Sequence, residues 1–290
     1  MWKSIRLALT AFVVVYAPPV TAHAKPPVWI VRDADSEMLL FGSIHVLPPR
    51  LDWTPPALAR ALEKADDIWF ELPIDPATEI EVAQLAYQNG VLPPDKSLSG
   101  LLSRKQAERL SRVAQSYGAS MATLDHLEPW YAEVALAVAY YQKAGGDPNL
   151  GVEKSVAADL PSQIRLRAFE TPAEQIALFD SAPLDEQVAS LDETLGDMES
   201  RPDQYKALVD AWMSGDAAAL DREALEPLRE ASPALFKRLV VDRNVRWVKT
   251  LRERLAGSGR TVVVVGVGHL VGADGLPARL RALGYSVEGP

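Results

Sequence analysis

Thr261-Val-Val-Val-Val-Gly-Val267 is the stretch that decides the fold, because this run of β-branched residues predicts the most buried strand of the chain. Two further apolar stretches lie near the other end of the sequence, Val28–Arg32 and Met38–Val46. The turn-forming residues Asp33–Ser36 join these two stretches and predict a β-hairpin. The strands of the sheet are therefore expected to come from both ends of the chain.

The segments between these ends predict an α/β protein. Strand patterns stand at Asp67–Leu72 and Tyr285–Val287, and Gln163–Phe169 alternates in the way of a half-buried strand. Helical patterns fill most of residues 76–160 and 172–256. We therefore expect a central mixed β-sheet with flanking helices and a helical insertion that covers the sheet as a cap. The length fits one α/β domain, residues 25–290.

Residues 1–24 have the three parts of a secretory signal peptide. Lys3 and Arg6 form a basic segment, an apolar run follows from Leu7 to Val15, and Ala22-His23-Ala24 is a small-residue cleavage site. The apolar run is shorter than the ~20 residues that a bilayer-spanning helix needs. We expect cleavage after Ala24, a periplasmic or secreted protein, and no stable membrane span once the signal is removed.

Charge and cysteine content narrow the function classes. The chain has a formal net charge of −9 and no run rich in Lys and Arg, so it offers no electrostatic footprint for nucleic acid. The absence of cysteine excludes disulfides and a lipoprotein anchor. The expected partner is a peptide or small-molecule substrate, and the oligomeric state stays open.

Two histidines share one sequence pattern. Gly42-Ser-Ile-His45 ends the second apolar stretch, and Gly266-Val-Gly-His269 ends the valine strand. In open α/β sheets, ligands bind beyond the carboxyl ends of the strands, where glycine permits close approach. Imidazole is both a general base near neutral pH and a common metal ligand. We predict that His45 and His269 converge in one site if their strands are neighbours.

Glu71 closes the strand Asp67–Leu72 at the same kind of edge. Two histidines and one carboxylate (His45, Glu71 and His269) form a ligand set for Zn²⁺, Mn²⁺ or a similar ion, with an open position for water. The same trio without a metal can act as a general base with its orienting partner. The residues alone leave both chemistries open.

Other polar residues stand beside these motifs. Glu153 opens a helix after a glycine-rich loop, and Arg243-Asn244 lies within a helix, where asparagine is unfavourable. We expect Glu153 to carry protons in catalysis. The residues expected to bind substrate or to support the site are Ser43, Glu170, Arg243 and Asn244.

In this order, the residues resemble the TraB/GumN family, which includes the TIKI metalloproteases. The most specific match is Val265–Gly272 together with Asp274-Gly-Leu276 and the segment from Leu280 to Val287. The family often has Asp where Glu153 stands and Leu where Phe169 stands. The other matching segments are Phe41–Pro48, Gly151-Val-Glu153, Phe169-Glu-Thr171 with Gln175, and Asp242-Arg-Asn244 with Trp247.

The resemblance implies a fold shared with erythromycin esterases and ChaN-like haem-binding proteins. It implies His45, Glu71 and His269 at the centre of the site, holding a divalent metal such as Mn²⁺ or Co²⁺. The resulting expectation is an exported metal-dependent hydrolase, with peptides as the first substrate class. A metal-free His/Glu esterase and a carrier of haem or another ligand are the alternatives, because one fold supports several chemistries.

Overall fold

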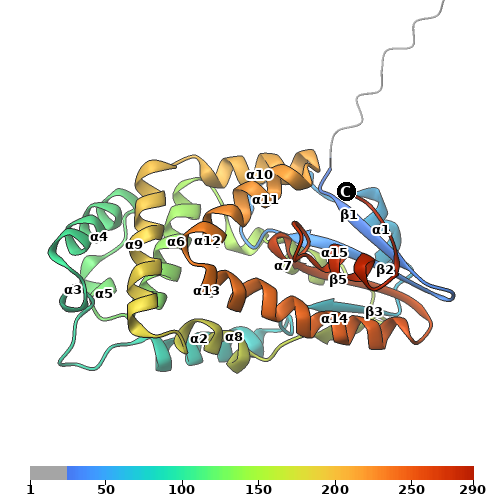
Figure 1. The fold of residues 1–290 in the computed structure, drawn as a ribbon, viewed down its shortest axis with the longest axis horizontal. Helices are drawn as coiled ribbons and strands as arrows, with labels where there is room; N and C mark the ends of the chain where they lie inside the picture. The colour runs from blue at the N-terminus through green and yellow to red at the C-terminus, as the bar shows by residue number, and fades with distance from the viewer. Residues whose placement is uncertain (1–24) are drawn as a thin grey trace, which may run out of the picture.

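The computed structural model describes residues 25–290, and the predicted signal peptide lies outside them. Six strands form one mixed sheet in the order β4-β3-β5-β2-β1-β6 (Figure 1). The valine strand β5 lies inside the sheet although it is close to the end of the chain. The strands are β1 (Val28–Arg32), β2 (Ser36–Ser43), β3 (Asp67–Phe70), β4 (Arg165–Ala168), β5 (Gly259–Gly266) and β6 (Ser286–Glu288).

Four neighbouring strands run parallel and end at the same edge of the sheet. β5 pairs parallel with β2 on one side and with β3 on the other, and β4 pairs parallel with β3. In this register Ser43 lies opposite Gly266, and Phe70 lies opposite Val264. The predicted hairpin of β1 and β2 is confirmed, and β6 pairs antiparallel with β1. Residues that follow β2, β3, β4 and β5 therefore meet beyond one edge.

Helices cover both faces of β5, which explains its composition. All residues from Thr261 to Val265 are buried, so neighbouring side chains on opposite faces are both covered. α1 (Pro56–Leu62) packs against β5 and β2. α14 (Asp242–Leu255) packs against β2 and α15 (Leu276–Ala282), which reaches β1. The predicted α/β class with a mixed sheet and flanking helices is confirmed.

Most other helices gather at one end of the molecule, beside the sheet (Figure 1). Tyr205 of α10 donates a hydrogen bond to the Val46 carbonyl at 3.1 Å, so these helices contact the chain just beyond β2. Within residues 25–290, no helix combines the length and apolar character needed to cross a membrane. The bounds are α2 (Pro76–Gly90), α3 (Leu98–Leu101), α4 (Arg104–Tyr117), α5 (Met121–Leu124), α6 (Pro129–Lys143), α7 (Val152–Ala158), α8 (Pro172–Asp180), α9 (Leu184–Ser200), α10 (Gln204–Ser214), α11 (Ala217–Ala224), α12 (Glu226–Ala231) and α13 (Pro233–Phe236).

Two predicted strands differ from the structure. The expectation of a half-buried strand over Gln163–Phe169 is wrong in burial, because β4 is shorter and its Leu166 is 54 % exposed. The reason is its position at the edge of the sheet, where a strand has a neighbour on one side only. β3 ends at Phe70, so Glu71 lies in the turn after the strand rather than at its end.

Gly42 marks a close contact between β2 and the turn after β5. A Cβ atom at this position would lie 2.7 Å from Val267 Cγ2 and 3.0 Å from Val267 Cα. The Gly42 carbonyl also accepts a hydrogen bond from Nε1 of the buried Trp212 at 2.8 Å. The first glycine of the Gly-x-x-His pattern is therefore required by packing.

Replacing this glycine should destabilise the protein. We expect Gly42→Ala to lower the free energy of unfolding by about 1–3 kcal/mol, because the added methyl group overpacks against Val267. Gly196→Ala is the matched control, since no atom lies within 4 Å of a Cβ at this position in α9. It should gain roughly 0.5–1 kcal/mol from helix propensity. Urea unfolding checks both values, and equal stability of the two variants would contradict the packing argument.

Candidate functional site

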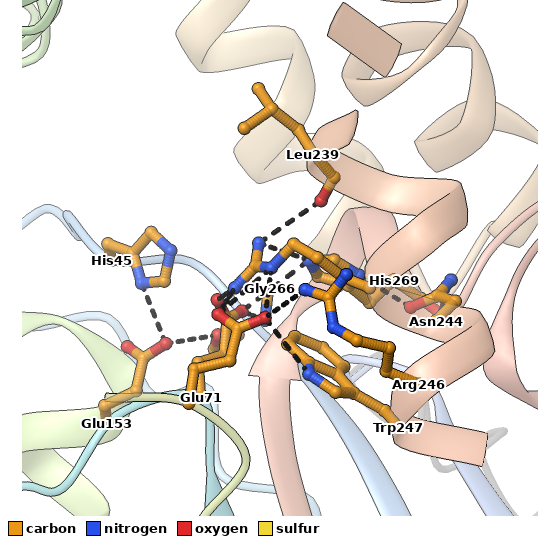
Figure 2. A network of polar contacts seen from close by, with 12 residues as sticks. His45, Glu71, Glu153, Leu239, Asn244, Arg246, Trp247, Gly266 and His269 are labelled. Atoms are coloured by element: carbon orange, nitrogen blue, oxygen red, sulfur yellow. Dashed lines mark hydrogen bonds and ion pairs between the residues drawn. The ribbon is translucent and has the colours of Figure 1, made fainter. Parts of the chain in front are cut away.

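A polar residue follows each of the four parallel strands at the same edge of the sheet. His45 follows β2, Glu71 follows β3, Glu170 follows β4 and His269 follows β5. The helices α7 and α14 add Glu153, Arg243 and Asn244 from their first turns. Figure 2 shows the side chains of His45, Glu71, Glu153, Asn244 and His269 gathered in one place, although they come from distant parts of the chain.

Arg243 lies at the centre of this cluster, and every donor of its guanidinium has a partner. Nε donates to the two Glu170 oxygens at 2.9 and 3.1 Å, and Nη2 donates to Glu170 at 2.7 Å and to Glu71 at 2.5 Å. Nη1 donates to the Leu239 carbonyl at 3.2 Å and lies 3.0 Å from His269 Nε2. Leu239 belongs to a π-helical turn, η2 (Lys237–Val241), that leads into α14. All hydrogen-bond donors of the Arg243 guanidinium therefore bind groups of the protein itself.

Glu170 is the main anchor of this arginine. It is only 5 % exposed and also accepts a hydrogen bond from Trp247 Nε1 at 3.2 Å. The Trp247 ring lies 4.6 Å from the Arg243 guanidinium and 4.4 Å from the His269 ring. Removing one partner of a buried ion pair costs about 3–5 kcal/mol, so this pair fixes the position of the groups around it.

Glu71 is held in its ionised form. Its carboxylate accepts hydrogen bonds from the Gly266 backbone N–H at 2.7 Å and from Arg243 at 2.5 Å. Burial opposes the charge, but Arg243, His269, His45 and the Gly266 N–H outweigh it and lower the pKa of Glu71 to about 2. A buried carboxylate thus faces the site at any physiological pH.

His269 is held in its neutral form, and its tautomer follows from its neighbours. Asn244 Nδ2 donates to the carbonyls of His269 and Asp274 at 3.2 and 2.9 Å, so Asn244 Oδ1 must be the acceptor toward His269 Nδ1 at 2.7 Å. The proton therefore sits on Nδ1, and the Nε2 lone pair faces Arg243 Nη1. Burial, with Arg243 acting in the same direction, lowers the pKa of His269 to about 3.

His45 has the opposite electrostatic character. Its Nδ1 lies 2.8 Å from Glu153 Oε1, and the same oxygen accepts a hydrogen bond from the Ser43 hydroxyl at 2.5 Å. The Glu153 carboxylate raises the pKa of His45 to about 9. The His45 side chain is 67 % exposed, so solvent and salt screen part of this attraction. With Nδ1–H directed at Glu153, Nε2 is left for a ligand.

Two glycines shape the space in front of His45. A Cβ on Gly266 would lie 3.2 Å from Glu71 Oε1 and 3.8 Å from His45 Nε2, so these two atoms border the same space above the glycine. A Cβ on Gly151 would lie 2.2 Å from the His45 carbonyl oxygen. This close approach lets α7 begin against His45 and places Glu153 beside its ring.

The structure brings all predicted site residues into two adjoining groups. The first group is His45, Glu153 and Ser43, of which only His45 is exposed, and the second, buried group is Glu71, Glu170, Arg243, Asn244 and His269. Their catalytic and substrate-binding roles stay predictions. Sequence reasoning missed the Leu239 carbonyl and the Gly266 N–H, because a backbone atom carries no signal in residue type.

Arg243 lies between two of the three predicted metal ligands. Arg243 occupies Glu71 Oε2 and His269 Nε2, and the shortest approach between Glu71 and the His269 ring nitrogen is 3.9 Å. A divalent ion bound to His45, Glu71 and His269 would have to displace or repel this buried cation. In the described part of the chain, no group of three or more histidine or acidic side chains is arranged to hold a metal ion. As they stand, these residues do not fit a three-ligand metal site.

Comparisons with known proteins identify a family and similar proteins. The sequence profile of the TraB/PrgY/gumN family matches residues 27–289. The chain is similar to the uncharacterized protein YbaP of Escherichia coli (strain K12), with 25 % identity over 260 residues that cover 89 % of this chain and 93 % of YbaP. YbaP of Shigella flexneri is similar to the same extent. No solved structure matches the chain significantly.

The two site histidines should titrate far apart in histidine-detected NMR. We expect His45 to titrate well above 6.5 and His269 to stay neutral, with its proton on Nδ1, down to about pH 3. Glu153→Gln should move the His45 midpoint down toward 6.5, because the neighbouring charge is removed. An unchanged His45 midpoint in this variant would contradict the electrostatic assignment.

Burial of neutral His269 should also make stability depend on pH. Between pH 6.5 and about 3 the unfolded chain binds a proton at His269 that the folded chain does not bind. The free energy of unfolding should therefore fall as the pH is lowered, with a slope that approaches ~1.4 kcal/mol per pH unit. His45, whose pKa is raised in the folded chain, contributes the opposite slope near pH 6.5, so chemical unfolding between about pH 5.5 and 5, where His45 is protonated in both states, measures the effect of His269. His269→Gln should flatten the slope. If this variant kept the wild-type slope, His269 would not be the cause of the pH dependence.

Proposed function

The chain belongs to the TraB/PrgY/gumN family, and we propose that it is an exported hydrolase in which His45 activates water. The observation that carries the proposal is the pairing of His45 Nδ1 with Glu153 at 2.8 Å, which leaves Nε2 free beside Glu71. A histidine oriented by a carboxylate is the usual arrangement of a general base. Export rests on the predicted signal peptide.

The reaction that this geometry supports is hydrolysis at a carbonyl carbon. Water would lie above Gly266, between His45 Nε2 and the ionised Glu71 Oε1. As the water oxygen adds to the carbonyl carbon, His45 takes one proton from the water. Protonated His45 then gives that proton to the leaving amine or alcohol as the bond to the carbonyl carbon breaks. The products are a carboxylic acid and an amine or alcohol.

The buried cluster supports this chemistry from behind. Arg243 holds Glu71 in place and keeps it charged, while Asn244 and Trp247 hold His269 against Arg243. Arg243 thus gives Glu71 the positively charged neighbour that a metal ion would otherwise supply. We therefore favour the metal-free form of the hydrolase and keep peptides as the first substrate class to test, with esters second.

Activity measurements on peptide libraries and simple esters test the proposal. His45→Gln should lower kcat by about 10²–10⁴-fold, because the general base is removed. His126→Gln is the matched control, since His126 is exposed and lies outside the cluster. The active form of His45 is the neutral one, so the rate should rise with pH toward about 9, and Glu153→Gln should move this midpoint down.

Metal content separates the metal-free form from the metal-dependent prediction. Activity should survive removal of divalent ions with a chelator, and the purified protein should contain less than stoichiometric Mn, Co or Zn. Stoichiometric metal that is lost in His45→Gln and His269→Gln would instead establish the metal-dependent hydrolase. A protein that hydrolyses neither peptides nor esters but shows a Soret band with haem, lost in His45→Gln, would establish the carrier alternative.

A further inference from the structure

A cavity lies among the helices beside the sheet. It has a volume of about 310 Å³ and is lined by residues of α6, α9, α10, α11 and α12, of which α6, α9 and α12 lie next to one another in Figure 1. An adjoining cavity of about 260 Å³ shares several of its walls, including Glu133, Tyr141 and Leu228. None of the predicted site residues lines either cavity, although Leu239, whose carbonyl accepts a hydrogen bond from Arg243, lines the second one.

The carboxylate of Glu133 faces both cavities and is held by two hydroxyl groups. Ser190 Oγ donates to Glu133 Oε1 at 3.1 Å, and Thr194 Oγ1 donates to the same oxygen at 2.7 Å. Ser190 and Thr194 stand four residues apart in α9, so both hydroxyls lie on the face that packs against α6. Glu133 Oε2 has no hydrogen-bond partner among the described residues and is left to the cavity.

No positive side chain of residues 25–290 forms an ion pair with Glu133. Arg238 lines the adjoining cavity but is paired with Glu186 at 2.7 Å. Glu193 and Asp197, which also line the first cavity, add negative charge to it. Burial raises the pKa of Glu133, and Glu193 adds to this rise, as expected for a carboxylate without a counter-charge.

A glutamine at this position could accept the same two hydrogen bonds without the desolvation cost of a carboxylate. The carboxylate is therefore explained best by a positive group that enters the cavity from outside. The remaining walls restrict that group, because Ala137, Leu208 and Leu228 are apolar and Tyr141 presents an aromatic ring. Aromatic rings attract organic cations, and apolar walls bind an aliphatic chain.

We propose that this cavity is a binding site for an organic cation, a primary ammonium group carried on a short aliphatic chain. The ammonium group pairs with Glu133 Oε2, and the chain lies against Tyr141 and Leu228. A bare metal ion is a poorer match, because among the described residues no three acidic or histidine side chains are arranged to hold one.

Binding of n-butylammonium and of 1-butanol to the full chain tests the proposal. The two probes have equal length and differ in charge, and their affinities can be measured by saturation-transfer NMR titration. We expect the ammonium probe to bind more tightly than the alcohol and Glu133→Gln to weaken its binding by about tenfold or more, a loss of ~1.4 kcal/mol. Glu81→Gln, on an exposed position of α2, should leave the affinity unchanged.

Stability of the ligand-free protein gives a second readout. Glu133→Gln should raise the melting temperature without ligand, because the unpaired carboxylate is removed and the hydroxyl contacts remain. A lower melting temperature would mean that Glu133 has a favourable internal partner and would overturn the proposal. Failure of butylammonium to bind, equal binding of butanol, or unchanged affinity in Glu133→Gln would overturn it as well.

Discussion

The buried ion pair between Arg243 and Glu170 is the interaction on which the rest of the site depends. A guanidinium that is only 6 % exposed must have all its donors satisfied, and here two carboxylates, an imidazole and a carbonyl do so. Because three partners follow β3, β4 and β5 and Arg243 itself stands in the first turn of α14, one side chain ties the carboxyl ends of three strands to a helix. The π-helical turn before α14 contributes the Leu239 carbonyl, in line with the frequent occurrence of such turns at functional sites.

The two histidines differ in protonation because His269 is buried, whereas His45 has the Glu153 carboxylate beside it. His269 lies beside the Arg243 cation and away from water, so it stays neutral and serves as a fixed acceptor. His45 lies on the solvent side between two carboxylates, Glu153 and Glu71, so it gains a proton readily. Two Gly-x-x-His motifs that look equivalent in sequence thus have opposite electrostatic environments. Only the outer histidine is free to exchange a proton with a ligand.

The sequence predicted much of this arrangement because its signals are local. The valine run and the hairpin turn predicted the strands, and histidines placed after strand ends predicted the edge at which they meet. The burial of β4 was predicted wrongly, because alternation in Gln163–Phe169 does not reveal whether a strand lies at the edge of its sheet. Residue type alone predicted that His45, Glu71 and His269 bind a metal ion. The structure instead places the Arg243 guanidinium against Glu71 and His269.

The sequence by itself determined which elements form, that strands from both ends of the chain share one sheet, and which side chains stand at its carboxyl edge. Periodicity, turn chemistry and strand ends act over a few residues, so they can be recognised without a partner in space. Only the tertiary structure decided the order β4-β3-β5-β2 and hence that Arg243 lies between Glu71, Glu170 and His269. Charge states were decided there too, because burial and the distance between charges fix the pKa of each group, and both are properties of the folded chain.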